Sequence, residues 1–510
     1  MRDAYASWHA LRILAPVVGL MMSGCVAVGP DYVIPDAKME QSWLGTLDTQ
    51  ERSRSCSLLW WESFGDPVLV DLVKHARENS PTLESAAVRI AQAAAQLAGS
   101  ASTEYLQSGK LSAGGKQIHH TKIGPFPEGT QQSAFGQGTA SWEIDFWGKY
   151  RRQIEADRAN VHATEAAYDD ALVSLTGQVA STYIDLRVSE ARLSIARQNT
   201  ELQRSEAAIA SAQHQLGETS ELAAAQAATL LAQTESQIPP LERMRAQDRD
   251  QLALLIGTTP TEIDGIVKAT GVVPVPPHAI DAGIPRDLLR RRPDVRQAAF
   301  DAAQQSALIG VTKAQLYPSF SLSGIFDVSS GYSHATDPFA LGSAGFSVLA
   351  GTLTLPVFNR GQLTSQVRVQ DAQFESAVLN YRNVVLQAQQ EVEDGLAGFS
   401  STSDALRPLQ RAVLTATRAL ELATRQYSAG EVAYQSVLDS QRSLSQDKDS
   451  LAQGQGALAQ AAVSLYRALG GGWERTVDDI PISEEIRTSM SARTSWGGLL
   501  DKTHEAALAR

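Results

Sequence analysis

The clearest chemistry in this sequence lies at Cys25, one of only two cysteines in 510 residues. Ser23 and Gly24 precede it, at the end of an apolar run that follows a basic N-terminal stretch. This order is the layout of a secretory signal peptide. We expect residues 1–24 to be that signal, because small side chains fit a narrow peptidase site and a thiol directly after them can accept a lipid.

The order Met22-Ser23-Gly24-Cys25 resembles the bacterial lipobox. The resemblance implies that Cys25 becomes the mature N-terminus and carries N-palmitoyl and S-diacylglycerol groups, and we expect no other cofactor. Val26 follows it in place of an acidic residue, so by the same resemblance the destination is the outer membrane of a Gram-negative bacterium. Each buried methylene of an acyl chain contributes about 0.8 kcal/mol. An ordinary export signal with an incidental cysteine is the alternative.

Other reactive residue types do not form a pattern that catalysis needs. His119-His120 falls between two expected strands without a further metal ligand at useful spacing, which favours a surface turn over a metal site. Gly136-Gln137-Gly138 lacks the third glycine and the following helix of a dinucleotide loop. We find no phosphate-binding lysine loop and no serine elbow. The sequence therefore predicts a protein that is not an enzyme.

Composition narrows the class of protein further. The net charge of -12 argues against nucleic acid as a partner. Only Cys56 remains besides Cys25, so an exported chain would have no internal disulfide and would depend on packing or assembly. No stretch after residue 25 is apolar for about 18 residues, which excludes a transmembrane helix in the mature protein. If this protein crosses a membrane, it does so as strands.

An internal repeat organises the chain. Six pairs of residues share an offset of 212 or 213 positions: Pro81 and Pro293, Tyr105 and Tyr317, Phe146 and Phe358, Gly148 and Gly361, Gly217 and Gly430, Gly257 and Gly470. Spacing this constant is typical of a tandem duplication. We expect the copies to join near residues 273–277, a stretch too rich in proline for a helix.

Each repeat contains two expected strands. Residues 136–146 and 319–329 alternate between apolar and polar side chains, which predicts strands with one apolar and one wet face. Residues 106–118 and 344–357 are weaker strand candidates. Strands of about 10 residues can cross a bilayer at a tilt. Four strands leave two edges that lipid cannot hydrogen-bond, so closure needs several chains, and three chains would supply twelve strands.

Long helices are expected beside the strands. Residues 149–216 contain no proline and would form a helix about 100 Å long. Apolar residues recur every seven positions, as in a coiled coil, in three sets: Val188, Ile195, Leu202, Ile209 and Leu216; Leu231, Ile238 and Leu252; Val437, Leu444, Leu451, Leu458 and Leu465. Arg245 interrupts the second set, and we interpret it as solvated or lumen-facing. Gln203 and Glu206 indicate a helix face exposed to water.

Several ordered motifs carry a family resemblance: Trp60-Trp61-Glu62-Ser63-Phe64-Gly65-Asp66-Pro67, Trp142-Glu143-Ile144-Asp145-Phe146-Trp147-Gly148-Lys149, Arg291-Arg292-Pro293-Asp294-Val295, Leu316-Tyr317-Pro318-Ser319-Phe320 and Ala468-Leu469-Gly470-Gly471-Gly472-Trp473. From residue 20 to about 475, the chain resembles the outer-membrane factors of tripartite efflux pumps, in particular the lipoprotein, NodT-like branch of the TolC superfamily. It departs at Gln107-Ser108, which lacks the counterpart of Pro318, and in the tail after residue 476.

The resemblance implies an α+β membrane protein that forms a homotrimer. Twelve strands would form a TolC-like β-barrel, four from each chain, and a long periplasmic α-helical coiled-coil tunnel would continue it. The expected segments are a signal peptide at 1–24, a lipid-anchored N-terminal segment and equatorial region at 25–78, outer-membrane-factor repeats at 79–270 and 271–472, and a C-terminal tail at 473–510.

The implied function is that of a passive exit duct for small molecules such as drugs or toxic compounds. Its partners would be outer-membrane lipid, a periplasmic adaptor protein and an inner-membrane RND transporter that supplies the energy. Two alternatives stay open. One is the outer-membrane duct of a type I protein secretion system, and the other is an envelope coiled-coil tether without a pore, which would not require the alternating strands.

Two positions on the long helices are candidate contact sites. Gly217 and Gly430 fall where the helices must reverse, near C-terminal ends at which glycine readily adopts a left-handed conformation. In the family these hairpin tips meet the adaptor, which implies that role for Gly217, Glu218, Gly430 and Glu431.

A candidate gate follows the second tip. By resemblance, Asp439 matches an aspartate that narrows the closed periplasmic entrance, and three copies would attract cations. Gln435 lies where the best-known relatives have leucine, which implies a second, polar ring. The simpler interpretation of Asp439 is a solvated aspartate paired with Arg442 three residues later.

Overall fold

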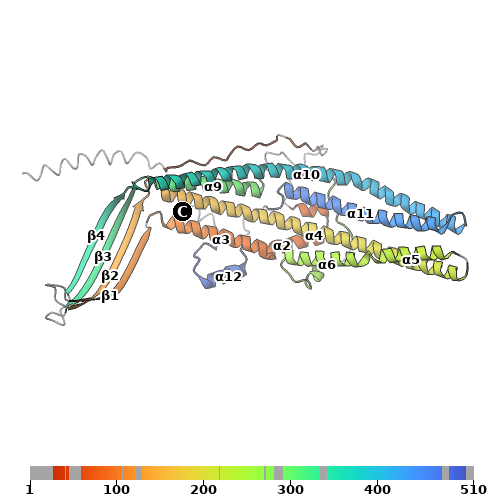
Figure 1. Ribbon diagram of the computed structural model, residues 1–510, viewed down its shortest axis with the longest axis horizontal. Helices are drawn as coiled ribbons and strands as arrows, with labels where there is room; N and C mark the ends of the chain where they lie inside the picture. The colour runs from red at the N-terminus through yellow and green to blue at the C-terminus, as the bar shows by residue number, and fades with distance from the viewer. Residues whose placement is uncertain are drawn as a thin grey trace, which may run out of the picture.

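The protein's computed structural model describes residues 27–40, 42–44, 59–105, 107–121, 129–217, 219–268, 271–280, 291–333, 342–473 and 482–500. Cys25, Cys56, Glu218 and the expected signal peptide lie outside these ranges. A four-stranded sheet forms one end of an elongated molecule, and long helices extend from it to two hairpin tips at the other end (Figure 1).

The two repeats contain matching elements in the same order. The first consists of α3 (Pro81–Ser102), β1 (Ser108–His120), β2 (Gly129–Ile144), α4 (Lys149–Gln215), α5 (Glu221–Glu235) and α6 (Ile238–Leu255). The second consists of α9 (Pro293–Ala314), β3 (Ser319–Ser333), β4 (Gly342–Thr354), α10 (Arg360–Ser428) and α11 (Tyr434–Ala468). Outside this pattern lie η1 (Trp60–Phe64), α2 (Pro67–Asn79), α7 (Ile263–Ile266) and α12 (Glu484–Arg493).

Helix α4 confirms the long helix expected from the absence of proline, since it runs unbroken for 67 residues. The partner helices differ between the repeats. In the second repeat α11 is continuous for 35 residues, whereas in the first α5 and α6 are separated at Ser236 and Gln237. Pro239 and Pro240 fall in the first turn of α6, where a missing backbone N–H breaks no helical hydrogen bond.

The four expected strands are confirmed, with revised ends. They form one antiparallel sheet in the order β1-β2-β3-β4. Strand β2 begins at Gly129, earlier than the alternation indicated, and ends at Ile144 rather than residue 146. It ends there because Asp145 Oδ2 accepts a hydrogen bond from the backbone N–H of Arg151 at 3.0 Å, which ties Asp145 to the turn into α4.

Two residues expected in a surface turn are part of the sheet. His119 and His120 are the last residues of β1, and the pairing with β2 continues to Gly129. His119 Nδ1 lies 3.0 Å from Thr130 Oγ1 on the neighbouring strand. The prediction of a turn was therefore wrong, because the strand pairing extends beyond the clear alternation of side chains.

The start of the first strand is stabilised by a side chain in place of the missing proline. Gln107 Oε1 accepts from the backbone N–H of Glu143 at 2.5 Å, and Gln107 Nε2 donates to the Glu143 carbonyl at 3.2 Å. The amide thus pairs with β2 as a strand residue would. In the second repeat, the Pro318 carbonyl accepts from Trp147 Nε1 at 2.8 Å.

The main core lies in the middle of the helical body. Trp60, Tyr183, Leu252 and Leu465 are among its fully or almost fully buried side chains, and they bring η1, α4, α6 and α11 together. The tail that the sequence motifs did not cover packs on this core through Ile482, Met490 and Leu500. Among the described residues, no helix is long and apolar enough to cross a membrane.

Residues 27–40, here called the strap, extend along the outside of α9 and α10 (Figure 1). The Val28 N–H donates to the Trp147 carbonyl at 2.9 Å, at the junction between β2 and α4. The Gln389 side chain donates to the Lys38 carbonyl and accepts from the Glu40 N–H, both at 3.0 Å. The strap therefore begins at the sheet and is held against the helices mainly through its backbone.

Of two helix positions expected to face water, one is buried and the other is partly exposed. Gln203 is 3% exposed, so the prediction of a wet face was wrong at this position. Arg245 interrupts the apolar set because its Nε lies 3.5 Å from Oε1 of Glu190, which is buried on α4. The Arg245 side chain is 42% exposed, so it is solvated as expected and is also held by a buried carboxylate.

Candidate functional site

The register of the sheet separates its side chains into two faces. Residues opposite each other in paired strands share a face. Gly138 is opposite Leu111 and Phe326, and Phe326 is opposite Ser347. Extending this register gives an apolar face with the large side chains Leu111, Trp142, Ile144, Phe320, Leu322, Phe326, Val328, Leu349 and Leu353. The expected alternation of β2 and β3 is confirmed. Strand β4 departs from it, because Phe346 and Val348 lie on the opposite face and Ser347 lies on the apolar one.

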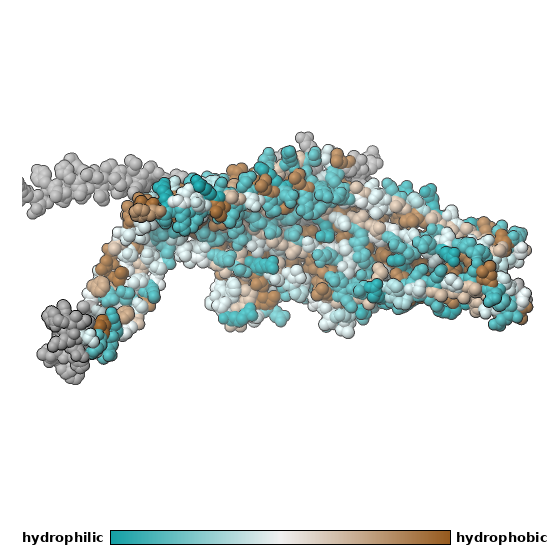
Figure 2. Space-filling view, viewed as in Figure 1, coloured by the Kyte–Doolittle hydropathy of each residue, from teal (hydrophilic) through white to brown (hydrophobic). Residues whose placement is uncertain are grey.

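The opposite face of the sheet is mostly polar. It contains Gln137, Thr139, Ser141, Ser321, Ser323 and Asp327, together with the apolar residues Phe135, Ile325, Phe346 and Val348. On the apolar face, Phe326 is 61% exposed and Leu349 is 76% exposed in the single chain. Hydrophobic residues are visible along the sheet, whereas hydrophilic residues dominate the helical body (Figure 2). A sheet with exposed apolar side chains on one face and polar side chains on the other suits lipid on one side and water on the other.

The edges of the sheet are open within the chain. In the described residues, β1 pairs only with β2, and β4 pairs only with β3. Exposed edges present unpaired backbone groups and invite pairing with another strand. The sheet of the single chain therefore has two edges at which further strands can pair.

Both predicted turn glycines adopt the left-handed conformation at the helix tips. Gly217 follows α4 with φ 75°, and Gly430 follows α10 with φ 76°. At the second tip, the Gly430 N–H donates to the Tyr427 carbonyl and the Glu431 N–H donates to the Gln426 carbonyl, both at 2.9 Å. This pair of bonds is the Schellman motif. Glu431 is exposed, so its carboxylate is accessible at the tip.

The predicted gate residues lie in the first two turns of α11 and contact each other. Gln435 Nε2 donates to Asp439 Oδ1 at 2.9 Å, and Arg442 Nη1 lies 3.4 Å from the same oxygen. The expected pairing of Asp439 with Arg442 is therefore present. The side chains of Asp439 and Arg442 are 54% and 55% exposed. Asp439 is held in place by two neighbours, and more than half of it remains accessible.

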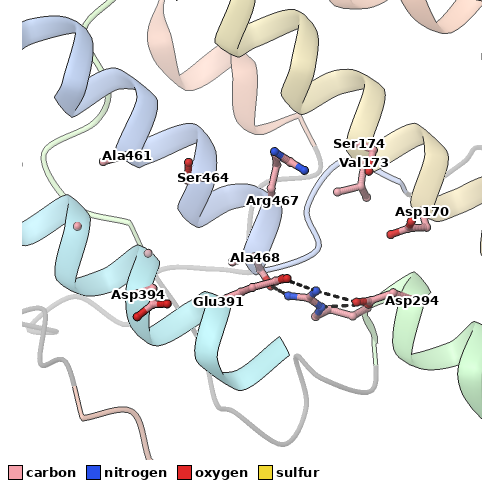
Figure 3. Close-up of a pocket in the computed structure, with 13 residues that line it drawn as sticks. Asp170, Val173, Ser174, Asp294, Glu391, Asp394, Ala461, Ser464, Arg467 and Ala468 are labelled. Atoms are coloured by element: carbon pink, nitrogen blue, oxygen red, sulfur yellow. Dashed lines mark hydrogen bonds and ion pairs between the residues drawn. The ribbon is translucent and has the colours of Figure 1, made fainter. Parts of the chain in front are cut away.

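A charged pocket of about 640 Å³ lies between α4, α9, α10 and α11 (Figure 3). Arg292 is its central side chain and is 8% exposed. Its Nε and Nη2 donate to the two carboxylate oxygens of Asp294 at 3.0 and 2.7 Å. Nη2 also donates to Glu391 and Nη1 to the Ala468 carbonyl, both at 2.6 Å. Arg292 thus fastens the start of α9 to α10 and to the end of α11.

Arg292 lies within one of the sequence motifs, but the motif alone predicts no role for it. The signal was available, because an arginine directly before Pro293 and Asp294 can pair with the aspartate at the helix start. Its partners Glu391 and Ala468 are 99 and 176 residues away and follow no local pattern. The contact between Arg245 and Glu190 also joins residues on different helices that no local pattern connects.

A model of the family described as outer membrane efflux protein matches the chain twice, at residues 72–258 and 284–471. This chain belongs to the outer membrane efflux protein family. The family consists of outer membrane channel proteins rather than enzymes, and membership places the chain in the outer membrane. The two matches agree with the duplication inferred from spacing, while the exact segment boundaries remain predictions.

The chain is also similar to individual relatives and to solved structures of other channels. Nodulation protein T of Rhizobium leguminosarum bv. viciae is 31% identical over 437 residues, which cover 84% of this chain and 87% of the relative. Pyoverdine export outer membrane protein OpmQ of Pseudomonas putida is 32% identical over 422 residues, which cover 81% of this chain and 88% of the relative. The outer-membrane channel OprN superposes with a TM-score of 0.79 at 28% identity, covering 88% of this chain and 99% of that chain.

Two carboxylates in the helical body of this efflux protein lie close enough to interact. Burial, and then the charge of Asp185 on α4, raise the pKa of Asp248 on α6 from 3.8 to about 6. A hydrogen bond from Ser189 Oγ at 3.3 Å partly offsets this rise. A carboxyl whose pKa is raised in the folded state binds its proton more tightly there than in the unfolded chain.

The stability of the protein should therefore fall as the pH rises from about 4 to about 6. The contribution of Asp248 is complete below its ordinary pKa and is lost as the pH passes the raised value. Its size is about 1 kcal/mol after allowance for solvent screening of a partly exposed group. Asp248→Asn should flatten this part of the pH profile of the melting temperature, and the exposed Asp250→Asn should not. An unchanged profile in Asp248→Asn would contradict the assignment.

Proposed function

We propose that this chain is the outer-membrane channel subunit of a tripartite, RND-type efflux system. In this proposal three chains pair their sheet edges into a twelve-stranded barrel, and the helices continue it as a periplasmic tunnel. The observation that carries the proposal is a sheet with one apolar face, one polar face and two open edges. Small molecules such as drugs or toxic compounds would leave through it passively, with energy supplied by an inner-membrane RND transporter.

The two alternatives are less well supported. A coiled-coil tether of the envelope needs no sheet with an apolar face, so the register of β1 to β4 favours a duct. A type I protein secretion duct would have the same fold. Small-molecule export is favoured by the similarity to OpmQ, which is described as a pyoverdine export protein, and by the lipobox-like sequence before Cys25.

The proposed lipid anchor fits the position of the strap. Val28 is hydrogen-bonded at the junction of the sheet and α4, and Cys25 precedes it by three residues. Three extended residues span at most about 11 Å. Acyl chains on Cys25 would therefore enter the membrane beside the strands that are proposed to cross it.

The channel function can be tested with the purified protein in planar bilayers and with the intact cell. We expect trimers that conduct ions in bilayers, and greater susceptibility to small toxic compounds in cells that lack the gene. Complementation by the full-length chain should restore resistance. A protein that remains monomeric in detergent and never conducts would refute the proposal, and a defect limited to polypeptide secretion would favour the type I alternative.

The gate assignment gives a prediction for Asp439. Asp439→Ala removes one carboxylate per chain and also the acceptor that Gln435 and Arg442 share. Closed-state conductance should rise, and the preference for cations should fall, because the charged ring is lost. Asp447→Ala, on the same helix, is the matched control and should leave single-channel recordings unchanged. An unaltered closed state in Asp439→Ala would remove this residue from the gate.

The tip assignment gives a separate prediction. Reversing the charge in the double variant Glu218→Lys and Glu431→Lys should weaken adaptor binding, because charge at a contact rim changes association. Trimer formation should be normal, since Glu431 is exposed and lies outside the helix core. Pull-down with the periplasmic adaptor and native gel electrophoresis measure the two effects. Full drug resistance in cells with the double variant would contradict the assignment.

A further inference from the structure

A row of polar contacts joins α4 to α11 along the helical body. On α4 the row uses one residue in every seven: Asp185, Arg192, Asn199 and Glu206. On α11 the partners, in the same order, are Gln460, Asp449, Ser445 and Gln441. The four contacts are 2.9, 2.7, 2.7 and 2.7 Å long. We call this row the polar ladder.

The polar ladder connects helices of different repeats. A seven-residue spacing keeps side chains on one face of a coiled coil, and polar residues at such positions set the register at a cost in stability. Between the core and the tips, the contact of α4 with α11 therefore includes hydrogen bonds that can be exchanged for water. Nearer the core, Tyr183 and Leu465 join the same two helices through apolar packing.

The rung nearest the tips has too many hydrogen-bond acceptors. Gln441 Nε2 donates to Glu206 Oε1 at 2.7 Å. Among the described residues, Glu206 Oε2, Gln441 Oε1, Gln203 Oε1 and the Tyr434 hydroxyl are buried without a hydrogen-bond partner. Gln203 and Gln441 are 3% and 5% exposed. Carbonyl and carboxylate oxygens can only accept, so leaving Glu206 Oε2 and Gln441 Oε1 of this contacting pair buried without a donor is unfavourable.

A proton resolves part of this imbalance. A protonated carboxyl group has one O–H donor, so a proton on Glu206 Oε2 turns an unsatisfied acceptor into a donor. We propose that Glu206 carries a proton when α4 and α11 are in contact, and that its ionisation loosens the first turns of α11. Gln435 and Asp439, the proposed gate residues, lie in those turns.

The electrostatic surroundings support this direction. Burial raises the pKa of Glu206, and the hydrogen bond from Gln441 partly offsets the rise. The titratable group that faces Glu206 from α11 is Tyr434. Burial, followed by the charges of Glu206 and of Tyr427 on α10, raises the pKa of Tyr434 to about 12. It therefore stays protonated near neutral pH.

The neighbouring charges on α4 and α5 are paired with each other. Arg204 Nη2 donates to Glu235 of α5 at 2.9 Å, and Arg204 Nη1 donates to Glu201 at 2.7 Å. Arg204 lies two residues from Glu206 and so does not share its helix face.

The raised pKa of Glu206 fixes the direction of the pH dependence. The proton on Glu206 stabilises the contact between α4 and α11 fully below the ordinary pKa of 4.5, and this stabilisation is lost as the pH rises through the raised pKa.

Hydrogen exchange of the full-length protein in detergent tests the proton on Glu206 directly. Protection of the segment 434–448, corrected for intrinsic exchange rates, should be several-fold lower at pH 8 than at pH 5. Glu206→Gln supplies a permanent donor and should keep the segment protected at both pH values. Glu206→Ala should leave it exposed at both. The exposed Glu201→Gln is the matched control and should retain the pH dependence of the unchanged protein.

Two results would overturn the proposal: protection that does not vary with pH in the unchanged protein, or a pH dependence that persists in Glu206→Gln. The effect on gating rests on the proposed channel function, so closed-state conductance is measured on the same variants. It should rise with pH in the unchanged protein and stay low in Glu206→Gln. If the hydrogen-exchange pattern is as expected but the protein never conducts, the channel function is refuted and the protonated contact stands. If the protein conducts but the exchange pattern is absent, only the protonated contact is refuted.

Discussion

Replacing Arg292 with alanine should lower the free energy of unfolding by about 1.5–3 kcal/mol, because a buried charged donor is lost while its two carboxylate partners are partly exposed. Asp294 and Glu391 would lose their shared cation, and the Ala468 carbonyl would lose its donor. Because Arg292 joins α9, α10 and α11, the loss should affect the helical body as a whole. Denaturant unfolding in detergent, followed by helical circular dichroism, measures the change.

The adjacent arginine provides the control. Arg291 is exposed, so Arg291→Ala should change the free energy of unfolding by less than about 0.5 kcal/mol. Arg292→Lys keeps the charge but cannot form the two parallel bonds to Asp294, and we expect an intermediate loss. If Arg292→Ala and Arg291→Ala are equally stable, the network does not hold the helices together.

Phe326→Arg should prevent stable insertion of the sheet into the outer membrane. Phe326 is central on the apolar face and 61% exposed in the single chain. A lipid-facing arginine near the middle of a membrane costs about 2–4 kcal/mol in each chain, and a trimer would contain three. The amount of trimer in the outer membrane fraction, measured by native gel electrophoresis, should fall sharply.

Ser323→Arg tests the face assignment with the same new charge. Ser323 lies three residues away on β3 and belongs to the polar face. Normal amounts of trimer are expected, because this side chain would face water inside the proposed barrel. Equal failure of both variants would mean that the register does not separate a lipid face from a water face.

The sequence predicted elements best where one local pattern dominates. Strict alternation identified β2 and β3, and the absence of proline from residue 149 onward identified α4. Constant spacing identified the glycines that end matching helices: Gly257 and Gly470 have φ angles of 72° and 68°. These features depend on neighbours along the chain, so a single sequence contains enough information to find them.

Contacts between distant segments were outside the reach of those patterns. Gln203 and Glu206 are polar, which indicated a wet face, but Gln203 is buried and Glu206 accepts a hydrogen bond from Gln441 of α11. The ion pair of Arg245 was not predicted, because its partner Glu190 lies on another helix. The ends of β1 and β2 were missed for a related reason, since backbone pairing extends a strand beyond its alternating side chains.

The pairing of β2 with β3 has a consequence for how such a wall could have arisen. This seam joins one repeat to the other, just as β4 of one chain would meet β1 of the next in the proposed trimer. The closed wall would then have six near-equivalent seams, three of them inside a chain. A half-length ancestor could have built the same wall from six separate copies, before gene fusion reduced the number of pieces that had to find one another.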